Sequence, residues 1–144
     1  MPTVRDILAD KGDRVHTIAP TATVMEAVEK MNHHRIGSLV VLDGDKVCGM
    51  FTERDVLQRV VGADRKPHEM LVMEVMTSDV ICCAPDDDLD DVASVMKDRR
   101  VRHVPVCSGP RMVGMVSMGD VNAQHASQQK MQISFLSEYV YGRA

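Results

Sequence analysis

The stretch Gly49-Met50-Phe51-Thr52-Glu53-Arg54-Asp55 recurs 65 residues later as Gly114-Met115-Val116-Ser117-Met118-Gly119-Asp120. Each copy predicts the end of a strand, then a hydroxyl, then a carboxylate at the start of a helix. The same spacing continues outside the motif without gaps, and it pairs Pro20 with Pro85, Met31 with Met96, Arg35 with Arg100, Val41 with Val106 and Gly44 with Gly109. A match this long indicates that the chain contains two copies of one unit.

The length of 144 residues suits one ordinary domain or two very small ones. A single copy of roughly 55–60 residues buries too little surface to be stable by itself. We therefore expect the copies to share an interface. The predicted division is residues 1–66 (core 15–62), 67–130 (core 80–127) and a C-terminal helix at 131–144.

Each copy predicts the element order β-α-β-β-α, which places the chain in the α+β class. In the first copy we expect a short strand at 15–18, a helix capped by Thr23, a hairpin of strands 38–42 and 46–51, and a helix at 53–61. The second copy predicts a strand at 80–83, a helix after Asp88, strands 102–107 and 111–116, and a longer final helix. A helical turn at 4–8 recurs at 72–76, at a spacing of 68.

Composition excludes several classes of function. The net charge of −4 and the pI of about 5.8 disfavour nucleic-acid binding, which needs a basic surface. No apolar run reaches the roughly 18 residues of a membrane span, and residues 1–6 lack a signal-peptide core. The four cysteines form no C-x-x-C motif, so we expect reduced core or half-buried thiols in a cytoplasmic protein.

The two hydroxyl-x-x-carboxylate pairs, Thr52/Asp55 and Ser117/Asp120, have two interpretations. Either pair can simply cap the helix that follows it. The preceding glycine, Gly49 or Gly114, allows a close backbone approach and favours a second interpretation. In that interpretation the carboxylate accepts both hydroxyls of a ribose, and the helix N-terminus faces phosphate.

These motifs, together with Arg100–Val106 and Ile18–Val24, resemble a tandem pair of cystathionine-β-synthase (CBS) domains, also called a Bateman module. The resemblance covers nearly the whole chain and is close to small stand-alone CBS-pair proteins. It implies two units packed through their sheets about a pseudo-twofold axis, with two clefts that bind AMP, ADP, ATP, NADH or S-adenosylmethionine.

The same resemblance assigns roles to residues of this chain. Asp55 and Asp120 would hold the ribose, with Thr52 and Ser117 beside them, and Met50 and Met115 would line the adenine slots. Val15 and His16 would cover the Asp120 site, and Val80 and Ile81 the Asp55 site. Arg102 and His103 would reach phosphate, whereas their counterparts are Gly37 and Ser38, so the two clefts should differ in charge and affinity. Arg54 is a further candidate phosphate ligand.

Other chemistry has weaker support. Gly44-x4-Gly49 and Gly109-x4-Gly114 have phosphate-loop spacing but lack the following Lys-Ser/Thr. Five aspartates at 86–88 and 90–91 fit helix capping without a metal ion. No nucleophilic constellation is evident, and family members are usually non-catalytic, so we expect neither an enzyme nor a required cofactor.

The last segment of the chain raises the question of partners. An apolar stripe recurs there at helical spacing and consists of Met131, Phe135, Leu136, Tyr139 and Val140. Such a stripe either folds back on the module or contacts a second subunit, and we favour the subunit contact and therefore a homodimer. Our leading hypothesis is a sensor of an adenine nucleotide. The alternatives are a protein-interaction module with vestigial clefts, a sensor of an S-adenosylmethionine-type ligand, and a regulator that acts on another enzyme.

Overall fold

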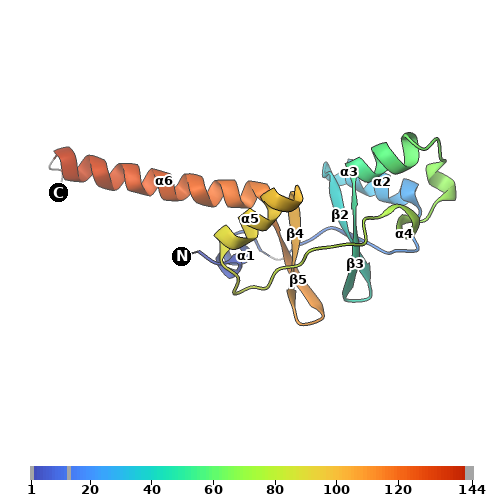
Figure 1. Ribbon diagram of the computed structural model, residues 1–144, viewed down its shortest axis with the longest axis horizontal. Coiled ribbons are helices and arrows are strands. Elements are labelled where there is room, and N and C mark those ends of the chain that lie inside the picture. Colours follow the sequence, from blue (N-terminus) through green and yellow to red (C-terminus); the bar gives the residue numbers. More distant parts are fainter. Residues whose placement is uncertain (1, 13, 142–144) are drawn as a thin grey trace.

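The computed structural model describes residues 2–12 and 14–141, with side chains described as far as Met131. Two similar units lie side by side, and each contains a β-hairpin flanked by helices (Figure 1). The two hairpins face each other in the middle of the molecule, where strands β3 (Lys46–Thr52) and β5 (Arg111–Ser117) are in contact. The predicted α+β architecture with two packed sheets is confirmed.

The first unit follows the predicted order closely. It contains β1 (Thr17–Ile18), α2 (Val24–His34), β2 (Ser38–Asp43), β3 and α3 (Glu53–Asp55). The Thr23 hydroxyl caps α2 by accepting the Glu26 N–H at 3.1 Å. The buried face of α2 consists of Val24, Ala27 and Met31, at the i, i+3 and i+7 positions of an amphipathic helix.

The helix predicted at 53–61 is not uniform. After α3 the chain continues as the π-helix η1 (Val56–Val61), and the Gly62 N–H donates to the Leu57 carbonyl five residues earlier. The chain then passes through the 3-10 turn η2 (Pro67–Glu69) to α4 (Val72–Val75).

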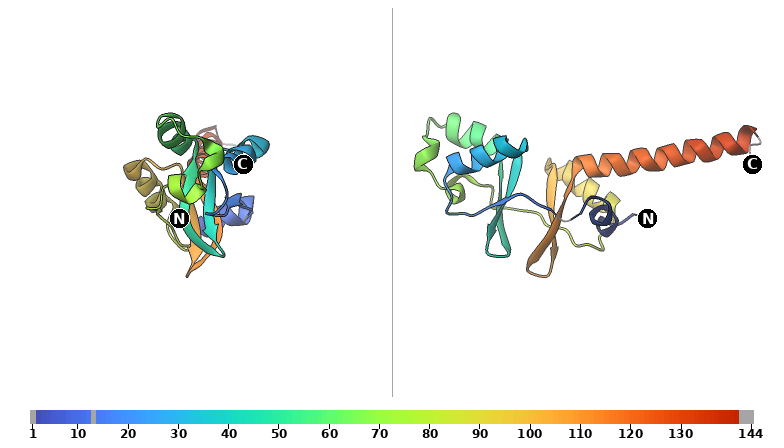
Figure 2. Two further views of the ribbon diagram at one scale, coloured as in Figure 1. Left: turned by 90° about the vertical axis from the view of Figure 1, so that its right-hand side faces the viewer. Right: turned by 180° about the vertical axis from the view of Figure 1, so that it is seen from behind.

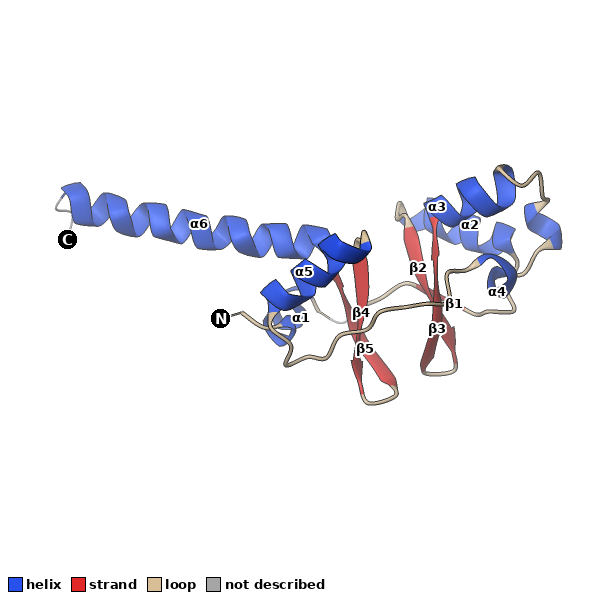
Figure 3. Cartoon of the chain, viewed as in Figure 1, coloured by secondary structure: helices blue, strands red, loops and turns tan. Residues whose placement is uncertain are grey.

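The second unit contains α5 (Leu89–Arg99), β4 (His103–Ser108), β5 and α6 (Met118–Tyr141). The predicted strand at 80–83 is wrong, because only Cys83 forms an isolated parallel bridge, to Val106. Figure 3 shows the segment that precedes α5 as loop. In the first unit the Val40 N–H donates to the His16 carbonyl at 3.2 Å and holds β1 against β2. Position 40 corresponds to Pro105, which has no N–H to donate, so the equivalent pairing is lost.

The short helices α1 and α4 each pack in the unit formed mainly by the other sequence repeat. Val4 and Ile7 of α1 (Val4–Lys11) lie in the core of the second unit, together with Leu89 and Met96. Conversely, Val72 and Val75 of α4 lie in the core of the first unit. Each structural unit therefore borrows a helix from the other sequence repeat, a feature that the predicted division at residues 66 and 67 does not capture.

The final helix differs from the predicted separate helix at 131–144. Residues 118–141 form one continuous helix, α6, whose later part projects away from the body of the molecule (Figures 1 and 2). The side chains of Phe135, Leu136, Tyr139 and Val140 lie outside the described residues. None of the helices described is long and apolar enough to span a bilayer.

The cysteines differ in exposure. Cys83 is buried, Cys48 and Cys107 are half-buried, and Cys82 is exposed, contrary to the expectation that all four lie in or near the core. Burial raises the pKa of the Cys83 thiol to about 12, so this thiol stays protonated at neutral pH.

Candidate ligand site

The Asp55 carboxylate is enclosed by the protein itself. Only 5% of the residue is exposed. Its Oδ2 accepts hydrogen bonds from the Thr52 N–H at 3.0 Å and the Thr52 hydroxyl at 3.2 Å, and its Oδ1 accepts one from the Thr77 hydroxyl at 3.1 Å. Both oxygens therefore already accept hydrogen bonds from the protein, and burial leaves an external ribose little access to them.

Arg59 adds a third side chain to the protein groups that surround the Asp55 carboxylate. Its guanidinium Nε lies 4.0 Å from Asp55 Oδ1. Its Nη1 donates to the carbonyls of Val75 and Met76, at 2.9 and 3.0 Å. The π-helical segment thereby ties the end of α4 to the motif carboxylate.

The Asp120 carboxylate is open on one side. The side chain is 22% exposed, and its Oδ2 accepts from Lys11 Nζ at 2.7 Å and from the Ser117 N–H at 2.8 Å. Oδ1 has no hydrogen-bond partner among the residues whose side chains are described. Burial by itself raises the pKa of this carboxyl, but the hydrogen bonds from Lys11 and Ser117 outweigh it and hold the pKa below its usual value.

The backbone of Arg102 and His103 lies next to the Asp120 motif, and their predicted contact with phosphate stays a prediction. His103 lies opposite Ser117 across the β4–β5 pair, and the Arg102 carbonyl accepts the Met118 N–H at 2.8 Å. Burial, then Lys11, then Arg102 lower the pKa of His103 below 6.5. This imidazole is therefore neutral at pH 7 and can donate or accept a hydrogen bond.

The corresponding surface beside Asp55 carries an additional carboxylate, that of Glu53. Ser38 lies opposite Thr52, and the Gly37 carbonyl accepts the Glu53 N–H at 3.0 Å. The Glu53 carboxylate packs so closely on Gly37 that an added Cβ would meet its Cδ at 2.9 Å. The residue equivalent to Glu53 in the second repeat is Met118, so the Asp55 motif has this second carboxylate and the Asp120 motif does not.

The remaining predicted residues lie in varied surroundings. Met50 is buried and exchanges backbone hydrogen bonds with Thr77, whereas Met115 is half-buried opposite Pro105. Arg54 is exposed. The His16 ring stacks on that of His34 with centroids 4.1 Å apart, next to the half-buried Val15.

Val80 and Ile81 are half-buried in the loop before α5, and Ile81 lines a groove of the second unit. The predicted covering of the Asp120 site by Val15 and His16, and of the Asp55 site by Val80 and Ile81, stays a prediction.

Two residues were missed by the sequence reasoning, Lys11 and Thr77. Lys11 is 109 positions from the carboxylate it contacts, and Thr77 is 22 positions from Asp55. Lys11 is the last residue of α1, Thr77 comes shortly after α4, and each of these short helices packs in the core of the other unit. The sequence shows that these helical turns are repeated, but it does not show which unit each of them packs against.

Known proteins resemble this chain in sequence and fold. The CBS domain model matches this chain twice, over residues 4–62 and 72–123. This chain belongs to the CBS domain family. A curated relative, the mitochondrial CBS domain-containing protein CBSX3 of Arabidopsis thaliana, is 30% identical over 97% of this chain and 72% of its own.

Solved CBS-pair structures share the fold. A putative signal-transduction protein with CBS domains from Burkholderia ambifaria is 34% identical, with a TM-score of 0.83, and covers 89% of this chain and 96% of its own. A second CBS domain pair, solved in complex with 5′-methylthioadenosine and S-adenosyl-L-methionine, is 27% identical with a TM-score of 0.75, over 89% of this chain and 98% of its own. CBS pairs are generally regulatory modules.

Proposed function

We propose that this CBS pair is a cytoplasmic, non-catalytic regulatory module that binds one adenosine-containing ligand, at the Asp120 motif. AMP, ADP, ATP and NADH are the leading candidates. The main support for this proposal is the difference between the two motif carboxylates. Asp120 presents a free Oδ1 at a partly exposed position, whereas both oxygens of Asp55 are engaged.

The chemistry around Asp120 supports an anionic nucleotide. A carboxylate can accept the hydroxyls of a ribose, and Lys11 and the N-terminus of α6 favour a negatively charged group. The charge of Arg102, which lowers the pKa of the nearby His103, acts in the same direction. Neutral His103 adds a hydrogen-bonding group that carries no charge at pH 7. A related CBS pair holds two adenosine-containing ligands, which supports the ligand class but not the individual compound.

Calorimetric titration with AMP, ATP, NADH and S-adenosylmethionine tests the proposal, with Asp120→Ala and Asp55→Ala as a matched pair. We expect one ligand per chain, binding lost in Asp120→Ala, and binding retained in Asp55→Ala. Loss of the Asp120 cap also costs about 0.5–2 kcal/mol of stability. If no adenosine compound binds, or if Asp120→Ala loses stability alone, the clefts are vestigial.

A protein-interaction function is the second candidate, and α6 favours it. The helix continues beyond the body of the molecule (Figure 1). Met131, the last residue whose side chain is described, is 70% exposed. We expect self-association through this segment. Sedimentation of the full chain and of a chain ending at Gln129 tests it, and an unchanged oligomeric state after truncation contradicts it. Dimerisation without adenosine binding would favour this candidate over the nucleotide sensor.

A further inference from the structure

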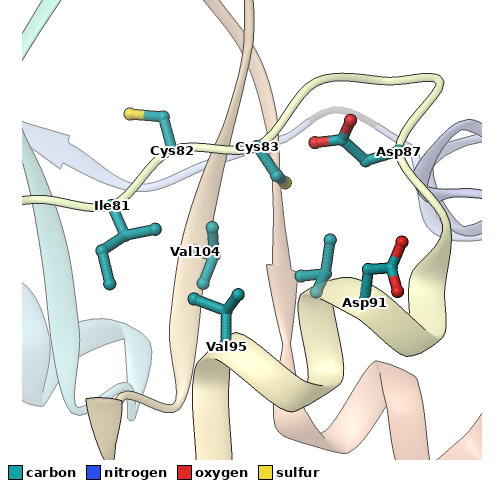
Figure 4. A pocket seen from close by; sticks show the side chains of 8 residues that line it. Ile81, Cys82, Cys83, Asp87, Asp91, Val95 and Val104 are labelled. Carbon is teal, nitrogen blue, oxygen red and sulfur yellow. The ribbon is translucent and has the colours of Figure 1, made fainter. Parts of the chain in front are cut away.

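A groove of about 250 Å³ opens on the second unit, between α5, β4 and the segment before α5. Ile81, Val95 and Val104 form its apolar part. Figure 4 shows the carboxylates of Asp87 and Asp91 together at the other end, near Cys83. The groove lies below the roughly 300–1,000 Å³ of pockets for drug-sized ligands, which points to a smaller molecule than a nucleotide.

The first unit shows what occupies the equivalent place there. Val95 corresponds to Lys30, and Cys82 corresponds to Thr17, at the repeat spacing. Lys30 is half-buried, and its ammonium group donates to the Thr17 carbonyl. An aliphatic chain that ends in an ammonium group therefore fits this position of the fold, because the protein supplies one itself.

The second unit keeps the surroundings but lacks this side chain. Val95 is too short to cross the groove and is 39% exposed. No hydrogen bond to the Cys82 carbonyl is present within the described part of the chain, although its counterpart at Thr17 accepts one. The groove is also more acidic than its counterpart, because Asp87 replaces Ala22 and Val95 replaces Lys30, while Asp91 keeps the negative charge of Glu26.

We propose that this groove binds a short aliphatic diamine. The methylene chain packs on Ile81, Val95 and Val104, and one ammonium group donates to the Cys82 carbonyl. The second ammonium group pairs with Asp87 and Asp91. Asp87 Oδ2 accepts the Ala84 N–H at 2.8 Å, so Asp87 is already oriented by the backbone. Two carboxylates with no cation among the lining residues exclude an anionic ligand.

Titration with 1,4-diaminobutane, followed by the NMR signals of the Val95 and Val104 methyl groups, tests the site. We expect saturable shifts that weaken with added salt. n-Butanol, which has a similar chain but no charge, should produce none. Asp91→Asn should weaken binding by up to about fivefold, as expected for one exposed ion pair. Absence of saturable shifts with the diamine overturns the proposal.

Val95→Lys is the decisive variant, because it restores the side chain that fills the first unit. We expect it to abolish diamine binding and to leave the melting temperature at or above that of the wild type. Met73→Lys, which adds the same charge at an exposed position on α4, serves as the matched control and should bind normally. Unchanged diamine binding in Val95→Lys would refute the site. Neither outcome bears on the adenosine titrations, because those test the Asp120 motif.

Discussion

The single residue Lys11 lowers the pKa values of two neighbouring side chains in the candidate site, Asp120 and His103. We expect Lys11→Met to raise the pKa of both Asp120 and His103, because the ammonium group favours the carboxylate and disfavours the imidazolium. NMR titration of the two side chains measures both shifts. Unchanged pKa values would show that the ion pair has no influence in solution.

The same ion pair predicts a pH dependence of stability. The pKa of Asp120 is lowered in the folded state, so its contribution is present above the unfolded pKa of about 3.9 and is lost as the pH falls through the folded pKa. Lys11→Met should cost up to about 1 kcal/mol at pH 7, and the deficit should vanish in acid. Arg5→Met is the control, because the Arg5–Asp86 pair is far more exposed and should contribute little.

Gly49 and Gly114 occupy equivalent positions but should respond differently to alanine. A Cβ at Gly49 would meet Met76 Sδ at 2.5 Å and the Thr77 backbone carbonyl at 3.0 Å, whereas at Gly114 it would meet only the flexible Leu8 side chain, at 2.7 Å. We expect Gly49→Ala to cost about 1–3 kcal/mol in chemical denaturation, and Gly114→Ala to cost less. Equal losses would contradict this account.

At the scale of elements, Pro105 explains why one strand is missing. Pro105→Val restores the residue type of Val40 and supplies an N–H for the Ile81 carbonyl, so the 80–83 segment should pair with β4 as β1 pairs with β2. Hydrogen exchange should show protection of the new amide. The net change in stability should stay within about 1 kcal/mol, because the new hydrogen bond is offset by the loss of the proline constraint on the unfolded chain. Rapid exchange at position 105 would refute the explanation.

At the scale of the whole molecule, the crossing of α1 and α4 predicts where destabilisation appears. Ile7→Ala should cost about 2–5 kcal/mol and speed hydrogen exchange in the second unit, although residue 7 belongs to the first repeat. Val75→Ala should loosen the first unit in the same way. Exchange that increases near the mutated repeat rather than across the molecule would contradict the crossed arrangement.

Much of the architecture could be predicted from the sequence because it depends on local signals. The 65-residue repeat, the Asp-Gly turn before Lys46 and the cap at Thr23 act over a few residues each, and the two hairpins and α2 agree with them to within a residue or two. The motif pairs also carried the resemblance to the CBS family, which the two matches of the CBS domain model confirm.

The duplication and the two carboxylates that mark the candidate sites, Asp55 and Asp120, can be read from the chain without coordinates. That Asp55 is enclosed and Asp120 is open follows from the three-dimensional packing. The closing hydroxyl of Thr77 and the ammonium group of Lys11 arrive on segments whose destination is set by packing of α4 and α1 against the opposite core. Repeat spacing carries no information about such long-range contacts, so equivalent motifs acquired different surroundings.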